Sequence, residues 1–173
     1  TGKGFAIGSA SLTALALLPE LLTNLPTDRY SVIQLQQEIK TYIGTLRFRV
    51  CVTGKEGENA VCTPYLAAHA SVLEDNWEKA VELLCEILLH THYNEPDRIR
   101  EIVMQSNEMG KQMGVMGGHM LGIAAVQSHY SAAAAATEAQ NGYTRIQWLH
   151  DMAKNFDGRI GDLIELLERV RTQ

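Results

Sequence analysis

The chain has 173 residues, of which 46% are hydrophobic, and this length and composition suit one domain with a substantial buried core. A formal net charge of -5 and scattered Lys and Arg residues argue against a nucleic-acid binder, which would carry a basic face. Three cysteines are too few for a disulfide scaffold and favour a reducing compartment, so we expect a cytoplasmic or organelle-matrix protein.

The first 16 residues are an atypical N-terminal segment, which we separate from a main domain at residues 17–173. Residues 4–18 carry no charge, but this run is shorter than the roughly 20 residues that a spanning helix needs. A remodelled strand, an engineered boundary, a fusion scar or a signal peptide would each account for the segment.

Two helices and a hairpin are predicted next. Leucines at 15, 18, 22 and 25, then apolar residues at 32, 35, 39 and 43, follow helical spacing. Thr27 or Asp28 can cap the second of these helices. Residues 46–52 alternate between apolar and polar side chains, which is typical of a half-buried strand, and a polar turn at 54–59 leads to a second strand at 61–71.

The hairpin predicts a relationship between two cysteines. With the turn centred between Glu56 and Gly57, Cys51 lies directly opposite Cys62. Cross-strand neighbours lie about 4.5 to 5.5 Å apart. We therefore expect mild oxidation to link these two residues and to leave Cys85 free, although both stay reduced in the cell.

The rest of the chain is predicted to be helical. Asp75 or Asn76 can cap a helix whose expected apolar face comprises Trp77, Ala80, Val81, Leu84, Ile87 and Leu88. Residues 96 to about 140 form a long helix that is interrupted at Gly114, Gly117, Gly118 and His119, because glycine costs about 1 kcal/mol against alanine inside a helix. An amphipathic helix at 156–171 ends the chain. The fold class is therefore α+β, mostly helical, with helices packed on one face of a small antiparallel sheet.

Several short segments occur in a familiar order and spacing. They are residues 17–25, Asp-Arg-Tyr-Ser at 28–31, Leu-Gln-Gln-Glu-Ile at 35–39, Gly-Gly-His at 117–119, Asn-Gly-Tyr at 141–143 and Asn-Phe-Asp at 155–157. Together they resemble the non-catalytic third domain, a peptidase-associated domain, of the presequence-protease branch of the insulinase/pitrilysin-like zinc metallopeptidases. The resemblance covers roughly residues 17 to 171. It fails at residues 4–18, where that family normally has a strand.

The resemblance implies a non-catalytic domain or fragment of a peptide-degrading zinc metallopeptidase, which helps to form a closed substrate chamber. Its partners would be the remaining domains of the parent peptidase and unfolded peptide. Zinc would belong to the parent enzyme, because this chain lacks the family's His-x-x-Glu-His and its equivalent helix, at 18–22, offers only Glu20. Glycines at 2–4 and 114–118 lack the setting of a phosphate loop. We expect no catalytic, cofactor-binding or metal-binding residue in this chain.

A few histidines suggest weaker alternatives. Glu86 and His90 lie one helical turn apart with His92 close behind, as metal ligands could, but a polar helix end is the simpler interpretation. His119 and His129 flank the glycine break and could meet only if the chain folds back.

Two other functions stay open at this point. The chain could be a stand-alone structural or interaction subunit derived from such a domain, or a small membrane-attached protein anchored by residues 4–18. In the family, strands precede residue 17 and follow residue 171, so the hairpin at 46–71 would be left with an open edge. We expect the isolated chain to self-associate through that edge or to pair it with residues 4–10.

Overall fold

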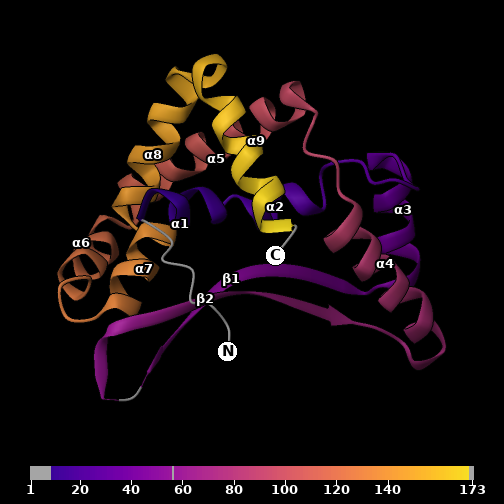
Figure 1. Cartoon of the computed structure of the whole chain (residues 1–173), viewed down its shortest axis with the longest axis horizontal. Helices are drawn as coiled ribbons and strands as arrows, with labels where there is room; N and C mark the ends of the chain where they lie inside the picture. Colours follow the sequence, from indigo (N-terminus) through magenta and orange to yellow (C-terminus); the bar gives the residue numbers. More distant parts are fainter. Residues whose placement is uncertain (1–8, 56, 172–173) are drawn as a thin grey trace.

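The computed structural model describes residues 9–55 and 57–171, and it is mostly helical with one two-stranded antiparallel sheet (Figure 1). Its elements are α1 (Ser9–Leu15), α2 (Leu18–Leu22), α3 (Val32–Tyr42), β1 (Thr45–Lys55), β2 (Glu58–Ser71), the 3-10 helix η1 (Glu74–Asn76), α4 (Trp77–His90), α5 (Pro96–Met116), α6 (Gly118–Gln127), α7 (Ala132–Asn141), α8 (Tyr143–Lys154) and α9 (Phe156–Arg171). The predicted α+β class is confirmed.

The helices cover one face of the hairpin. Figure 1 shows β1 and β2 along one side of the molecule, with α3 and α4 at one end and α6 and α7 at the other. Successive strand residues face opposite sides of a sheet. Phe48 is buried, and a Cβ built on Gly54 would lie 3.5 Å from the Cβ of Ala133 in α7. The even-numbered residues of β1 therefore face the helices, as the α+β prediction requires.

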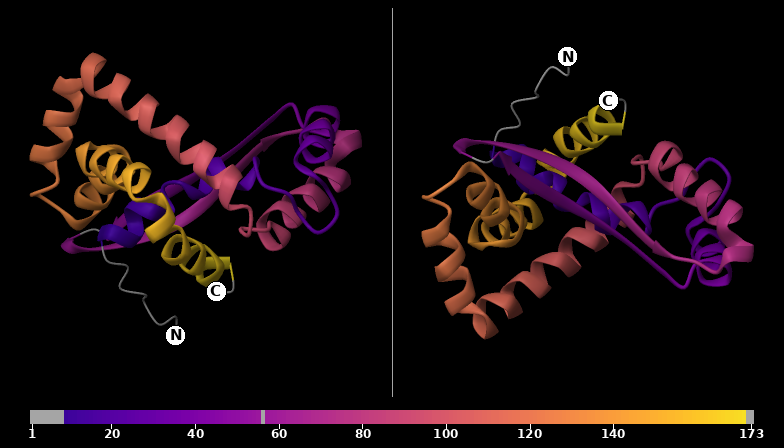
Figure 2. Two further views of the ribbon diagram at one scale, coloured as in Figure 1. Left: turned by 90° about the horizontal axis from the view of Figure 1, so that it is seen from above. Right: turned by 90° about the horizontal axis from the view of Figure 1, so that it is seen from below.

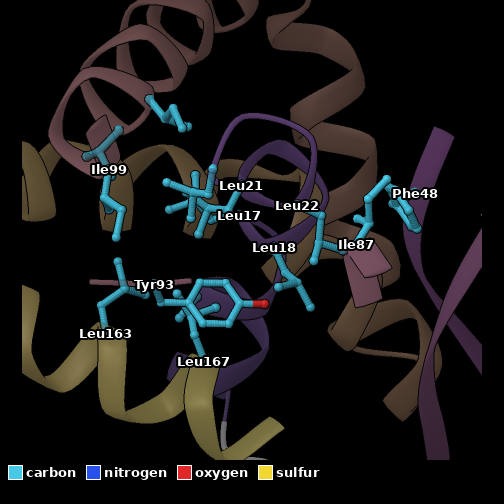
Figure 3. Close-up of a cluster of buried hydrophobic side chains, with 14 of the residues drawn as sticks. Leu17, Leu18, Leu21, Leu22, Phe48, Ile87, Tyr93, Ile99, Leu163 and Leu167 are labelled. Carbon is cyan, nitrogen blue, oxygen red and sulfur yellow. The ribbon is translucent and has the colours of Figure 1, made fainter. Parts of the chain in front are cut away.

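The core lies around α2, which crosses the middle of the molecule. Figure 3 shows its leucines among side chains from β1, α4, α5 and α9. The fully buried members of this cluster include Leu17, Leu21, Leu22, Leu25, Ile87, Ile99 and Leu167. Because burying one such side chain contributes roughly 1.5 to 3 kcal/mol, α2 is held by packing even though it is only five residues long.

The turn of the hairpin lies where the sequence predicts it, but the strands beyond it are offset. Lys55 pairs with Glu58 beside the turn, whereas the next residue, Gly54, pairs with Cys62. Residues 59–61 are therefore extra residues on β2, and this irregularity shifts the register of the remaining pairs by three positions.

The shifted register separates the two cysteines that we expected to face each other. Cys51 pairs with Tyr65, not with Cys62. Paired residues share a face and successive residues alternate, so Cys51 and Cys62 point to opposite faces of the hairpin. The prediction that they lie opposite each other is wrong, because the turn alone does not reveal the irregularity next to it. Both are free cysteines in the structure, as is Cys85.

The start of α3 also differs from expectation. Its N-cap is Ser31, whose side chain accepts a hydrogen bond from the Gln34 backbone N–H, while the Gln34 side chain accepts one from the Ser31 backbone. This reciprocal capping box satisfies two N–H groups at the helix start. Thr27 and Asp28 lie upstream in the loop, so the prediction that one of them caps the helix is wrong.

The core-facing side of α4 is partly different from the predicted face. Ala80 and Ile87 are buried as expected, and Leu83 is buried with them. Trp77, by contrast, is 64% exposed. It is the first residue of α4, and only residues one to three turns further along reach the core.

The long helix is broken at the predicted glycines and again further on. Gly117 separates α5 from α6, with φ -119° and ψ 22°, outside the helical region. The two helices meet at an angle in both views of Figure 2, and they have different neighbours, with α5 on α8 and α6 on α7. A second break before Ser131, whose side chain accepts a hydrogen bond from Ala134 N–H, was not predicted.

The N-terminal segment contributes a helix to the domain. α1 contacts α7, and Ala14 belongs to the buried core. The strand considered at residues 4–10 falls largely on residues 1–8, which lie outside the described residues, and Ser9 and Ala10 are helical. A division of the chain at residue 16 and self-association through a sheet edge stay predictions.

Candidate functional site

The helix at the position of the family's zinc helix is α2, and its side chains divide between the core and a polar cluster. Leu18, Leu21 and Leu22 are buried in the core. Glu20 points elsewhere, and its carboxylate accepts hydrogen bonds from the Ser106 hydroxyl of α5 and from Nη2 of Arg145 in α8, the latter at 2.5 Å. The side chains of Glu20 and Arg145 are 39% and 22% exposed.

A small pocket adjoins this cluster. Its volume is about 130 Å³, and its lining residues are Glu20, Ser106, Met109, Gly110, Met113, Arg145, Ile146 and Leu149. Ligand pockets are usually about 300 to 1,000 Å³, so this one has room for a single side chain rather than for a cofactor. Among these lining residues there is no His or Cys, and the serine hydroxyl donates to a carboxylate that an arginine already neutralises. The arrangement holds helices together and offers no base for nucleophilic chemistry.

The sequence analysis named Glu20 only as a residue unable to hold a metal by itself, and it did not single out Ser106 or Arg145. These partners lie 86 and 125 residues away from Glu20 along the chain. No local spacing could have revealed contacts of this range.

The candidate metal ligands of α4 are drawn to different partners. Glu86 is buried and accepts a hydrogen bond from the backbone N–H of Arg29, whose Nε lies 3.6 Å from its carboxylate. His90 and His92 instead face Asp28, with 2.7 Å between His90 Nδ1 and Asp28 Oδ2 and the same distance between His92 Nε2 and Asp28 Oδ1. The proposed Glu86–His90–His92 constellation is therefore not assembled.

The Asp28 cluster joins two loops. Backbone hydrogen bonds run from Asp28 N–H to the His90 carbonyl and from His92 N–H to the Pro26 carbonyl. The hydrogen bond from His90, with the charge of His92, lowers the pKa of Asp28, although partial desolvation opposes the shift. These contacts fasten the loop before α3 to the end of α4, which is a structural role.

No group of three or more His, Cys, Asp or Glu residues within the described parts of the chain is arranged to hold a metal ion. His119 lies in α6 and His129 follows that helix, and both are exposed. Gly2, Lys3 and Gly4 lie outside the described residues. None of the described helices has the length and apolar content to cross a membrane.

Fold and sequence together define a peptidase-associated domain, and comparison with known proteins agrees. The model of the peptidase-associated family from subgroup C of the pitrilysin-like metallopeptidases matches residues 6–152, and the chain belongs to this family. The match begins upstream of residue 17, where we expected the resemblance to start.

A more distant similarity is found to Protein HypA from Clostridium perfringens (strain 13 / Type A), which is 24% identical over 157 residues. The aligned region covers 91% of this chain but 16% of that relative. The chain thus spans less than a fifth of the length of the relative that it matches.

Proposed function

We propose that this chain is a non-catalytic domain of a larger zinc metallopeptidase that degrades peptides, and that it helps to enclose the substrate chamber. The observation that carries the proposal is the family match over residues 6–152. The packing of α2 supports a non-catalytic role, because Leu18, Leu21 and Leu22 fill the core where zinc-binding residues would otherwise be needed.

The parent enzyme would supply zinc and the water-activating glutamate from another domain. This chain would contribute a folded wall, contacts to the remaining domains and contacts to unfolded peptide. We place the protein in the cytoplasm or an organelle matrix, since its three cysteines are free. We propose no nucleic-acid partner, given the net charge of -5.

Of the two alternatives, the membrane-anchored protein has no support from the described helices. The stand-alone subunit differs from our proposal in one testable respect, which is the presence of a His-x-x-Glu-His segment in the same gene product.

The complete gene product tests the proposal. We expect it to hydrolyse unfolded peptides, to lose this activity on treatment with a zinc chelator, and to leave folded proteins intact because a closed chamber excludes them. A photo-reactive unfolded peptide should cross-link to residues of this domain. A gene product without the zinc motif, or one that cleaves peptides without any contact to this domain, would contradict the proposal.

A further inference from the structure

The second half of α5 and all of α6 project from the rest of the molecule. We call residues 108–130 the α5–α6 arm. None of these residues is buried, whereas the first half of α5 contributes Ile99, Ile102 and Val103 to the core. Both views of Figure 2 show the corner between α5 and α6 standing away from the other helices.

The surface of the α5–α6 arm is apolar. Val115 is 88% exposed, Met116 is 83% exposed and Tyr130 is 72% exposed. Other exposed apolar side chains on the arm are Met109, Met113, Met120, Ile123 and Val126. A solvated helix normally carries charged residues on its outer face, and a helix that is apolar all round is normally buried. The arm thus has the composition of a buried element without the burial.

Charge is absent from the arm over a long stretch. From Gln112 to Thr137 the sequence contains no Asp, Glu, Lys or Arg. Depletion of charge with enrichment of methionine and aromatic residues is typical of the buried centre of protein interfaces. The partner that covers the arm is therefore apolar.

Three glycines indicate how close that partner comes. Gly114, Gly118 and Gly122 follow one another at intervals of four residues, and a Cβ built on any of them would meet nothing within 4 Å. Gly118 and Gly122 lie on one side of α6, because residues four apart share a helix face. Without Cβ atoms, this side admits the close approach of another backbone.

We propose that the α5–α6 arm is the docking surface for a neighbouring domain of the parent polypeptide, which packs an apolar helix against it. This inference rests on the proposed function. It is supported by the length of chain that lies outside the matched region, since that region is only 16% of the related HypA protein. A continuous uncharged surface suits a permanent contact better than a substrate that must leave, because permanent interfaces are the more hydrophobic ones.

Thiol labelling of the arm tests this directly. The three native cysteines are replaced by serine, and Met116→Cys is compared with Ile33→Cys, an apolar position on α3 that is 72% exposed. We expect Met116→Cys to react rapidly in the dilute isolated chain and about tenfold or more slowly in the complete gene product. The Ile33→Cys variant should react at the same rate in both.

Three results would overturn the inference. These are equal labelling of Met116→Cys in both proteins, equal protection of Ile33→Cys, and concentration-dependent protection in the isolated chain, which would make a second copy the partner. The reading frame and peptidase assay decide the proposed function separately, so a gene product that is a zinc peptidase with an unprotected arm would refute only this inference.

Polar substitution provides a second readout. Val115→Lys with Met116→Lys should leave the melting temperature of the isolated chain unchanged, because both side chains are already in water. The same pair should lower the melting temperature of the complete gene product, whereas Ile33→Lys should not. Equal effects of the arm pair in the two proteins would contradict docking through the arm.

Discussion

Arg145 and Glu20 form an ion pair between α8 and α2, with 2.5 Å between Nη2 and Oε1. The pair lies on the outer side of the helix whose other face fills the core, and Ser106 of α5 donates to the same carboxylate. Three helices distant in sequence are thus joined at one carboxylate. In this domain, the glutamate of α2 serves packing rather than metal chemistry.

Removing the arginine should destabilise the domain measurably. We expect Arg145→Ala to lower the free energy of unfolding by about 1 kcal/mol, a figure reduced from that for fully buried charged hydrogen bonds because Glu20 is partly exposed. Lys111→Ala removes a more exposed pair with Glu108 and should cost less than about 0.5 kcal/mol. Urea unfolding measures both, and equal losses would show that the Glu20 pair has no special role.

The register of the hairpin predicts which cysteines can be joined. In the wild-type chain, mild oxidation should not link Cys51 to Cys62, because they point to opposite faces. In a Tyr65→Cys variant, Cys51 should link to position 65, its cross-strand partner. Mass mapping of the peptides distinguishes these results. A Cys51–Cys62 link in the wild type would mean that the irregularity beside the turn is absent.

The glycines at the break should respond differently to alanine. A Cβ on Gly117 would lie 3.2 Å from the carbonyl oxygen of Met113, a backbone atom that moves only with its helix. A Cβ on Gly118 or on Gly114 meets nothing within 4 Å. We expect Gly114→Ala and Gly118→Ala to stabilise the isolated chain by about 0.5 to 1 kcal/mol.

In the same isolated chain, Gly117→Ala should bring no gain in the free energy of unfolding, because its Cβ crowds the turn before it. Thermal unfolding of the single variants provides the comparison. An equal rise in melting temperature for Gly117→Ala would indicate a helix that runs continuously through this position.

The Asp28 cluster predicts a pH dependence. The folded-state pKa of Asp28 is lowered, so as the pH falls the unfolded chain takes up the proton first. The stability that Asp28 contributes is therefore fully present above pH of about 4 and is lost as the pH falls through its folded-state pKa. Asp28→Asn should be less stable than the wild type at neutral pH, and the difference should shrink in acid.

Urea unfolding at about pH 7 and about pH 3 measures this difference. Asp75→Asn, at an exposed carboxylate in η1, serves as the control and should change stability little at either pH. A gap between wild type and Asp28→Asn that widens in acid would contradict the assigned direction of the pKa shift.

Local patterns in the sequence predicted the elements well, but not the relations between them. The alternation at residues 46–52 predicted β1 because burial of one sheet face requires a period of two. The same alternation could not reveal the extra residues 59–61, which leave no trace in periodicity. The turn before α7 was missed because the alanines that follow it favour helix strongly, although Ser131 just before them is a recognisable cap.

The contacts of the candidate sites were the least predictable part. His90 and His92 were noticed because they lie together, but Asp28, which binds both, lies 62 residues from His90 in sequence. The glycine break was predicted from composition alone, since glycines are costly in helices. Exposure of the α5–α6 arm was not predicted, because the sequence of a buried helix and that of an uncovered interface helix are alike.

The zinc content of the isolated 173-residue chain tests the central claim, that this domain has no catalytic metal of its own. After purification in metal-free buffer, elemental analysis should find no stoichiometric zinc, and the same sample should not hydrolyse an unfolded peptide. The complete gene product should bind about one zinc ion per chain through its own motif. About one zinc ion in the isolated chain, lost together with peptidase activity in His90→Ala, would contradict the account.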